Sequence, residues 1–272
     1  MFNINEEFFR ERLVEVFLTY PFPDTKLKTC VDIGANVGAF SVIFSNYCEK
    51  VISIEPFKEN FDYMEKKIKD LGIKNVLTIN KAVSKTEGET VMMNVRKNNT
   101  DSKDISCVDT EYSGETVNLG EINTISLDYL VEKFGEIDYL KVDCEGCEYN
   151  FLYEQNLDKI KSVITEVHGG FVGEGGKKTL LGYLDEKFDE SYPEVVNEDN
   201  PKEFVNDVRG KTTKKFHYAH QLYPHEFIFR KKGTPNYKDL LFVRYSTFNP
   251  DNVGLLPPIF EKHLTTCKKY MV

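Results

Sequence analysis

The sequence has 272 residues, of which 40% are hydrophobic and 29% are charged, and its formal net charge is −9. This length accommodates one large α/β domain, or a domain with a lid, and the composition is typical of a globular protein. No run approaches the roughly 18 apolar residues of a membrane-spanning helix, and residues 1–20 include four acids. We therefore expect neither a membrane span nor a secretory signal peptide.

The charge is divided unevenly along the chain. Residues 201–272 contain 13 basic and 6 acidic residues, whereas residues 1–200 contain 22 basic and 38 acidic residues. Four of the five histidines also lie in the last 72 residues. The basic extension predicts either a phosphorylated or acidic substrate or a lid that docks electrostatically, although a solvated basic surface is the commoner reason for such a run.

The chain begins with an amphipathic pattern over residues 5–20, which predicts a helix that covers a sheet. A strand ending near residue 33 then leads into a glycine turn, a helix at 39–47 and a second strand at 50–55. A strand, a glycine turn, a helix and a second strand with an acid at its tip are typical of a nucleotide-binding unit. Glycines let the backbone approach a ligand closely, and the N–H groups at a helix start can bind it.

The rest of the chain alternates between predicted strands and helices. Strands are predicted at residues 76–83, 89–96, 115–125, 137–143, 162–167, 226–230 and 240–245, the last two as an antiparallel hairpin. Helices are predicted at residues 57–71, 127–134, 148–155 and 177–188, with a polar loop at 97–113 and a glycine-rich stretch at 169–176. This order predicts an α/β fold with a doubly wound, mostly parallel, seven-stranded sheet.

We divide the chain into three parts. Residues 1–28 form an N-terminal helical cover, and residues 29–196 form the nucleotide-binding core. Residues 197–272 form a basic C-terminal lid or extension that completes the sheet.

The residue before the glycine turn favours a positively charged cofactor. A dinucleotide-binding turn carries three glycines in a G-x-G-x-x-G pattern, whereas this turn has only Gly34 and Gly38 after Asp32. The Asp32 carboxylate would repel a pyrophosphate but attract the ammonium and sulfonium groups of S-adenosylmethionine (SAM). Glu55, at the tip of the second strand, would accept hydrogen bonds from both ribose hydroxyls. The alternative is that Asp32 only caps a tight bend.

A second acidic cluster follows the strand at 137–143. Lys141, Asp143 and Glu145 lie at the carboxyl end of this strand, where ligands bind in open α/β sheets. Such a cluster can act as a general base, a clamp for a divalent metal ion, or a grip on the methionyl amine. His168, at the end of the next strand, is a candidate base near neutral pH, or else a structural histidine. Lys141 is expected to form an ion pair with the neighbouring acids rather than to act in catalysis.

The six cysteines form no repeating framework. Cys144 and Cys147 make a lone C-x-x-C motif with no second pair, so we do not expect zinc. Thioredoxin-like chemistry is also not expected, because the motif does not open a helix after the first strand of a βαβ unit. The pattern favours a reducing compartment and hence a cytoplasmic protein.

Taken together, the motifs resemble those of the FkbM-type methyltransferases. The resemblance spans roughly residues 29–168 and rests on the order and spacing of DIGANVG at 32–38, ISIEP at 52–56, NKAVS at 80–84, SLDYL at 126–130, LKVDCEGCE at 140–148 and TEVH at 165–168. It implies the Rossmann-like fold of class I SAM-dependent methyltransferases. It also implies O-methyl transfer to hydroxyl groups of sugars or natural products.

The resemblance assigns roles to individual residues. It implies that the methionyl and ribose side of SAM is held by Asp32, Gly34, Asn36 and Gly38, that Glu55 takes the ribose hydroxyls, and that Lys81 and Ala82 lie near adenine. Asp143 and Glu145 match the D-x-E-G signature and would face the methyl group, and Glu166 and His168 match the E-x-H ending. The cysteines on both sides of Glu145 and Gly146, and the long extension, depart from the family pattern.

The sequence therefore predicts SAM-dependent O-methyl transfer to a carbohydrate, with catalytic residues Asp143, Glu145 and His168. The base would be His168 or Asp143, and Glu145 would position the acceptor or bind a divalent ion. We assign no set of metal ligands.

Three other functions remain as alternatives. A non-catalytic SAM or nucleotide sensor with a partner-binding tail fits the same turn. An RNA methyltransferase is disfavoured by the acidic body, and an NAD-dependent enzyme by the missing third glycine.

Overall fold

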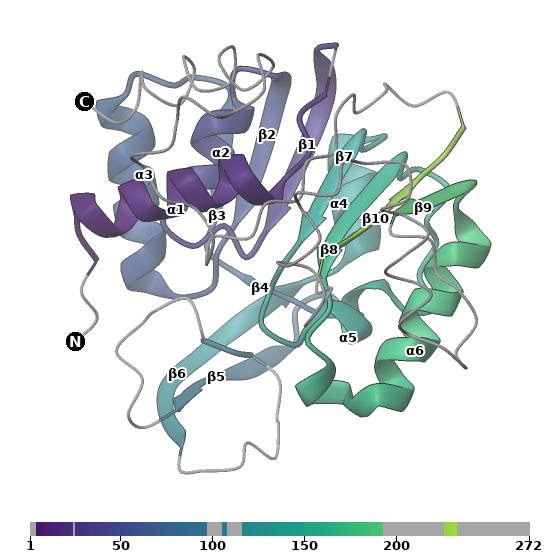
Figure 1. Ribbon diagram of the computed structural model, residues 1–272. Coiled ribbons are helices and arrows are strands. Elements are labelled where there is room, and N and C mark those ends of the chain that lie inside the picture. Colours follow the sequence, from purple (N-terminus) through teal and green to yellow (C-terminus); the bar gives the residue numbers. More distant parts are fainter. Residues whose placement is uncertain (1–3, 24, 97–104, 108–115, 193–225, 233–272) are drawn as a thin grey trace, which may run out of the picture.

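The computed structural model describes residues 4–23, 25–96, 105–107, 116–192 and 226–232. Its main sheet has seven strands in the order β3-β2-β1-β7-β8-β10-β9 among these residues (Figure 1). The strands are β1 (Leu27–Ile33), β2 (Cys48–Ile54), β3 (Val76–Ile79), β7 (Tyr139–Val142), β8 (Ser162–Glu166), β9 (Glu190–Tyr192) and β10 (Glu226–Arg230). From β3 to β8 neighbouring strands pair in parallel, and β10 pairs antiparallel with β8 and β9. The predicted fold class is confirmed.

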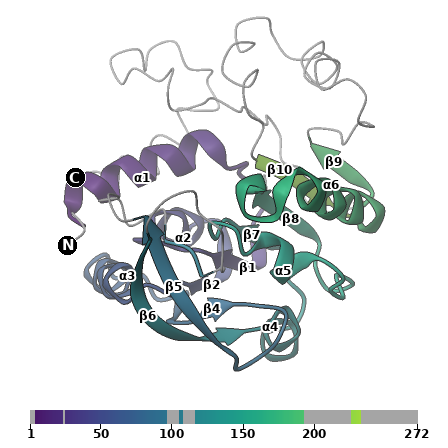
Figure 2. The same ribbon diagram turned by 90° about the horizontal axis from the view of Figure 1, so that it is seen from below.

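Helices cover both faces of this sheet. The helices are α1 (Glu6–Thr19), α2 (Ala39–Phe44), α3 (Lys58–Asp70), α4 (Leu127–Phe134), α5 (Glu148–Leu152) and α6 (Gly169–Lys187). Side chains of α1, α2 and α3 share one hydrophobic cluster with one face of the sheet, and those of α4, α5 and α6 share a second cluster with the other face. Figure 2 shows α1 and α4 on opposite sides of the sheet. Successive strand residues point to opposite faces, and both faces are covered, which explains why nearly every residue of β1, β7 and β8 is buried.

The single strand predicted at residues 76–83 is in fact two strands. After β3 the chain leaves the main sheet, and β4 (Ala82–Val83) pairs in parallel with β6 (Thr116–Ile125). The Asn80 side-chain amide donates to the carbonyl oxygens of Glu55 and Pro56 at 2.8 and 2.9 Å. These hydrogen bonds hold the chain at the point where it turns away.

The strands predicted at 89–96 and 115–125 are close to β5 (Thr90–Arg96) and β6, which pair antiparallel in a second, three-stranded sheet. Helix α6 begins at Gly169, whereas the sequence predicted a helix only from residue 177. Glycine has a low intrinsic helix propensity, and tertiary context overrides such preferences. The short strand β9 was not predicted, and the strand expected at 240–245 lies outside the described residues, as does most of the loop at 97–113.

In the part of the chain that the structure describes, no helix is both long and apolar enough to cross a membrane. The three-part division of the chain remains a proposal. Of the C-terminal extension, residues 226–232 are described, and they contribute β10 to the sheet.

Candidate functional site

Two adjoining cavities lie at the carboxyl ends of the parallel strands. The first, here called the Glu55 cavity, is lined by residues that include Glu55, Asn60, Lys81, Ala82 and Cys107. The second, here called the His168 cavity, has a volume of about 350 Å³ and is lined by residues that include Arg12, Glu15, Tyr20, Phe40, Glu166 and His168. The residues that line both cavities are Gly34, Asn36, Asp143 and Glu145. These shared residues mark the junction between the cavities.

The glycine turn is held tightly against the end of β7. Gly34 has φ +72°, and a Cβ at this position would lie 1.8 Å from the backbone oxygen of Asp143. Only glycine fits this conformation and this contact without displacing the backbone. The N–H groups of Gly34 and Ala35 both donate to the carbonyl of Ile54 at 3.0 Å, which fixes the turn to β2.

Asp32 lies beneath the turn and lines neither cavity. Its side chain is fully buried, accepts a hydrogen bond from Ser41 at 2.7 Å, and has Oδ1 3.1 Å from the Lys141 ammonium. Lys141 also donates to the carbonyl oxygens of Ile33 and Gly34 at 3.1 and 2.8 Å. Burial alone would lower the pKa of Lys141, but the nearby carboxylates of Asp32 and Asp143 outweigh it and raise that pKa.

The pairing with Lys141 differs from the direct contact with a charged cofactor that was predicted for Asp32, and the role in cofactor binding stays a prediction. Because its charge is neutralised by a buried cation, the Asp32 carboxylate does not present a negative charge to a cofactor. In this structure Asp32 supports the turn from below and does not face either cavity. Gly38 also lines neither cavity; it starts α2, with φ +84°.

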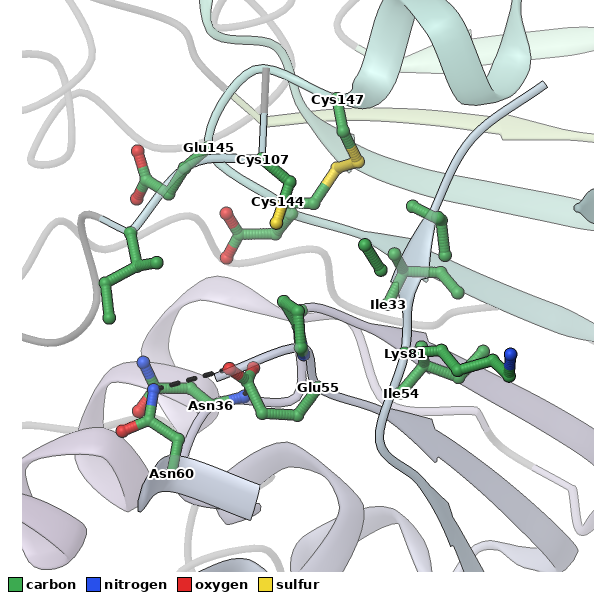
Figure 3. A pocket seen from close by; sticks show the side chains of 16 residues that line it. Ile33, Asn36, Ile54, Glu55, Asn60, Lys81, Cys107, Cys144, Glu145 and Cys147 are labelled. Carbon is green, nitrogen blue, oxygen red and sulfur yellow. Dashed lines mark hydrogen bonds between the residues drawn. A yellow bond between two sulfur atoms is a disulfide. The ribbon is translucent and has the colours of Figure 1, made fainter. Parts of the chain in front are cut away.

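Glu55 lies where β2 ends, and its carboxylate faces the first cavity (Figure 3). It accepts hydrogen bonds from the backbone N–H groups of Asn36 and Phe57 at 2.8 and 2.9 Å. Burial raises the pKa of Glu55 to about 7, although these hydrogen bonds oppose the rise. Lys81 and Ala82 lie on the same cavity, and the Lys81 side chain extends away from Glu55. The structure thus brings Gly34, Asn36, Glu55, Lys81 and Ala82 together around one cavity.

Asp143 lies at the junction of the two cavities. Its Oδ2 accepts a hydrogen bond from the Tyr20 hydroxyl at 3.2 Å and lies 3.8 Å from the Lys141 ammonium. Its side chain is 27% exposed, so the carboxylate is oriented by protein groups and still reachable by a ligand. Tyr20 follows α1, more than 120 residues away in sequence, and no local pattern could have linked it to Asp143.

Carboxylate groups lie close to both ring nitrogens of His168. Nδ1 lies 2.9 Å from Glu148 Oε1, and Nε2 lies 3.3 Å from Glu145 Oε2 and 3.7 Å from Glu166 Oε1. Burial would lower the pKa of His168, but the hydrogen bond and charge of Glu148, with the charges of Glu145 and Asp143, raise it to about 10. At neutral pH the ring is therefore an imidazolium, which cannot accept a further proton. The role of general base predicted for His168 is not supported by this arrangement.

The same cluster of side chains contains the residues that could bind the divalent ion considered from the sequence. One ligand atom from each of Asp143, Glu145 and His168 lies within 4.8 Å of the others, which is compatible with a shared ion. A metal-bound histidine must be neutral, however, and His168 would first have to lose its proton. The His168 proton and its two carboxylate partners therefore compete with a divalent ion for these ligand atoms.

The C-x-x-C motif holds an unexpected bond. Cys144 and Cys147 form a disulfide, whereas Cys30, Cys48 and Cys107 are free thiols. The spacing of the two cysteines is visible in the sequence, but reduced thiols were expected there because the oxidation state of a lone pair cannot be read from its spacing.

Comparisons with known proteins agree with this geometry. A family model described as the methyltransferase FkbM domain matches residues 32–199. No curated protein gives a significant match. Similar solved structures include a methyltransferase FkbM from Methylobacillus flagellatus, with 14% identity, a TM-score of 0.35, and coverage of 60% of this chain and 40% of that chain.

Two further structures come from other enzymes. A precorrin 8w decarboxylase from Methanobacterium thermoautotrophicum has 15% identity and a TM-score of 0.39 over 66% of this chain and 72% of that chain. An rRNA methylase from Streptococcus thermophilus has 12% identity and a TM-score of 0.38 over 85% of this chain and 99% of that chain. These scores are too low to assign an activity.

Proposed function

The chain belongs to the FkbM methyltransferase family, and we propose that it transfers a methyl group from SAM to a hydroxyl group of a carbohydrate. The observation that carries this proposal is the junction of the two cavities at Asp143 and Glu145. A cofactor in one cavity and an acceptor in the other would meet there. Both carboxylates follow β7, at the edge where ligands bind in open α/β sheets.

The Glu55 cavity suits the nucleoside part of SAM. A carboxylate is an acceptor-only group, so the Glu55 oxygens can receive hydrogen bonds from both ribose hydroxyls. Lys81 and Ala82 line the same cavity and would lie beside the adenine ring. The turn from Gly34 to Gly38 would then run along the methionyl part, with its backbone close to the ligand.

The His168 cavity suits a neutral, hydroxyl-rich acceptor. It combines carboxylates with the aromatic rings of Tyr20 and Phe40, which pack edge to face with centroids 5.1 Å apart. Carboxylates accept hydrogen bonds from hydroxyl groups, and aromatic faces pack against the C–H faces of sugars. The acids of this cavity slightly outnumber its cations, which suits an uncharged acceptor better than the phosphates of RNA. The acids are Glu15, Asp143, Glu145 and Glu166, and the cations are Arg12, Lys141 and the His168 imidazolium.

The residues at the junction would prepare the acceptor for transfer. When bound, SAM supplies an electrophilic methyl group whose sulfur leaves as a neutral thioether. Asp143 would accept the proton of the acceptor hydroxyl, and Tyr20 and Lys141 would orient its carboxylate. The paired Glu145 and His168 would fix the acceptor in line with the methyl group. Such alignment can lower a barrier by up to about 7–11 kcal/mol.

The direct test is methyl transfer from labelled SAM to a panel of saccharides. We expect a labelled saccharide together with S-adenosylhomocysteine (SAH), and no labelled product when RNA is the acceptor. Transfer to RNA would favour the RNA methyltransferase alternative. Tight SAM binding with no transfer to any acceptor would favour the non-catalytic sensor.

The Glu55→Ala substitution is expected to weaken SAM binding by at least about tenfold, because each hydrogen bond to a charged group is worth about 1.5–3 kcal/mol. Glu55→Gln should have a smaller effect, since it keeps one acceptor oxygen. The exposed acid Glu59, in the first turn of α3, provides a matched control, and Glu59→Ala should leave affinity unchanged. Isothermal titration calorimetry measures all three. An unchanged affinity in Glu55→Ala would rule out the ribose assignment.

SAM affinity is expected to rise with pH between about 6 and 8. In the free protein the pKa of Glu55 is raised to about 7, and ribose hydroxyls bind the ionised carboxylate better. Below pH 7 binding must first release a proton, so affinity should fall by up to about tenfold from pH 8 to pH 6. Calorimetry in buffers of different ionisation enthalpy would detect this proton. Glu55→Gln should flatten the profile; a profile that stays sloped in this variant would point to another group.

A further inference from the structure

The disulfide between Cys144 and Cys147 closes the loop that carries Glu145. The two Cα atoms are 5.5 Å apart, and only Glu145 and Gly146 lie between the cysteines. The bond thus joins the end of β7 to the start of α5, across the junction of the two cavities.

The backbone of the closed loop has positive φ angles at two successive residues. Glu145 has φ +54° and Gly146 has φ +107°, so two successive residues lie in the positive-φ region. For a residue with a Cβ the left-handed conformation costs about 1–2 kcal/mol. The buried Glu148 carboxylate stabilises the loop by accepting from the N–H groups of Cys144 and Gly146 at 3.1 and 3.2 Å. The disulfide adds a covalent limit on how far Glu145 can move.

The position of Glu145 matters for both cavities. Its carboxylate lies 3.3 Å from His168 Nε2, and its side chain lines both cavities. If the bond opens, the loop keeps the hydrogen bonds to Glu148 and the contact between Glu145 and His168 but loses its covalent closure, so that Glu145 can relax to negative φ. That change would move the Glu145 carboxylate away from His168.

The disulfide is also within reach of a redox partner. Both cysteines line the Glu55 cavity, and the Cys144 side chain is half-buried (Figure 3). Cys107 lines the same cavity, but burial, and to a lesser degree the charge of Glu55, raises the pKa of its thiol to about 12. A thiol at this pKa is a poor nucleophile, and Cys30 and Cys48 are buried in the core. Among the cysteines that the structure describes, the Cys144–Cys147 pair is therefore the best placed for thiol–disulfide exchange.

We propose that Cys144 and Cys147 form a reversible redox site that controls cofactor binding, with the disulfide as the binding-competent form. This inference rests on the proposed SAM site. The electron donor is a dithiol reductant, and the disulfide of the oxidised reductant is the electron acceptor when the bond forms again by the reverse exchange. One thiolate of the reductant attacks a sulfur of the pair and displaces the other as a thiolate. The second thiol of the reductant then resolves the mixed disulfide, leaving two thiols here and one disulfide in the reductant.

The proposal has a reciprocal consequence. If the disulfide form binds the cofactor more tightly, bound cofactor must make the disulfide harder to reduce by the same factor. A cofactor in the Glu55 cavity would also cover Cys144. Cofactor binding and reduction should therefore oppose each other.

The test compares the oxidised and the dithiothreitol-reduced full chain. Thiol labelling under denaturing conditions, read by mass spectrometry, should find two more thiols after reduction. Calorimetry should then show SAH binding at least about fivefold weaker in the reduced form. By linkage, saturating SAH should lower the midpoint potential of the pair by about 20 mV, which is the same fivefold factor converted for two electrons.

Cysteine variants test whether the loss of SAH affinity on reduction comes from the Cys144–Cys147 disulfide. The double variant Cys144→Ser with Cys147→Ser should bind SAH as weakly as the reduced chain and ignore the reductant. Cys107→Ser, which changes the other cysteine of the same cavity, should keep the response to reduction. Should the double variant not fold, the reversible titration of the unmodified chain decides on its own.

The outcomes separate this inference from the proposed function. Equal SAH affinity in the two redox forms, or no new thiols after reduction, overturns the redox site and leaves the proposed function standing. Failure of both forms to bind SAH overturns both.

Discussion

Replacing Asp143 by asparagine is expected to slow methyl transfer by about 10²–10⁴-fold, the usual contribution of a general base, while SAM affinity stays within about twofold. Asparagine keeps the shape of the side chain and can still accept the hydrogen bond of the Tyr20 hydroxyl. It cannot take the proton of an acceptor hydroxyl. The substitution therefore removes a proton acceptor with little change in the packing.

Asp143 is a better candidate for this role than its neighbours. His168 has a raised pKa and carboxylates near both nitrogens, so it is already protonated at neutral pH. Glu145 and Glu166 lie 3.3 and 3.7 Å from the His168 ring, which holds them by charge. Asp143 is turned instead towards Tyr20 and Lys141, at the place where the cavities meet.

Steady-state kinetics with saturating SAM, together with calorimetry, would test this prediction. Glu166→Gln is a matched control, because Glu166 lines the His168 cavity but not the Glu55 cavity. We expect it to change turnover by less than about tenfold. Equal losses of SAM affinity and turnover in Asp143→Asn would instead assign Asp143 to the methionyl amine, and unchanged turnover would exclude it as the base.

The sequence predicts those parts of the site whose position follows from nearby strands and turns in the same stretch of chain. Glu55 could be placed because a strand end, a turn and an acid at a fixed distance are all visible in one stretch of chain. The carboxylate pair after β7 could be placed in the same way, since carboxyl ends of parallel strands share one edge. The doubly wound, mostly parallel character of the sheet followed from the alternation of strands and helices, whereas the strand order did not.

Other features depend on partners that are distant in sequence. Asp32 looked like a charge facing the cofactor, but its partner Lys141 reaches it across neighbouring parallel strands, β1 and β7. His168 looked like a base because its pattern does not reveal that Glu148 and Glu145 face its two nitrogens. In both cases the residue was found, but the groups that surround its side chain could not be predicted because they are distant in sequence.

The Gly34→Ala substitution should abolish SAM binding and destabilise the fold by more than about 4 kcal/mol, a loss that requires a specific structural cause. The cause is the contact with Asp143, whose backbone oxygen would lie 1.8 Å from the new Cβ. A backbone atom cannot swing aside like a side chain. Relief would require the end of β1 to move away from β7, at the cost of the Lys141 hydrogen bonds to Ile33 and Gly34.

Gly72 supplies a control with nearly the same backbone conformation. Its φ is +68°, against +72° for Gly34, and a Cβ there would meet no atom within 4 Å. Gly72→Ala therefore isolates the cost of a left-handed alanine, about 1–2 kcal/mol. For a chain of this size that cost corresponds to a fall of about 2–8 °C in melting temperature.

Differential scanning fluorimetry and SAH calorimetry on the two variants separate two effects. One is the backbone strain of an alanine at positive φ, which both variants share, and the other is the steric clash with Asp143, which only Gly34→Ala has. Gly72→Ala should melt slightly earlier and bind SAH normally. Gly34→Ala should melt much earlier, or fail to accumulate as folded protein, and should not bind SAH. Similar melting temperatures for the two variants would mean that the turn can move away from Asp143. In that case the junction of the two cavities would not be rigid, and the alignment that the proposed methyl transfer requires would have to come from the bound acceptor instead.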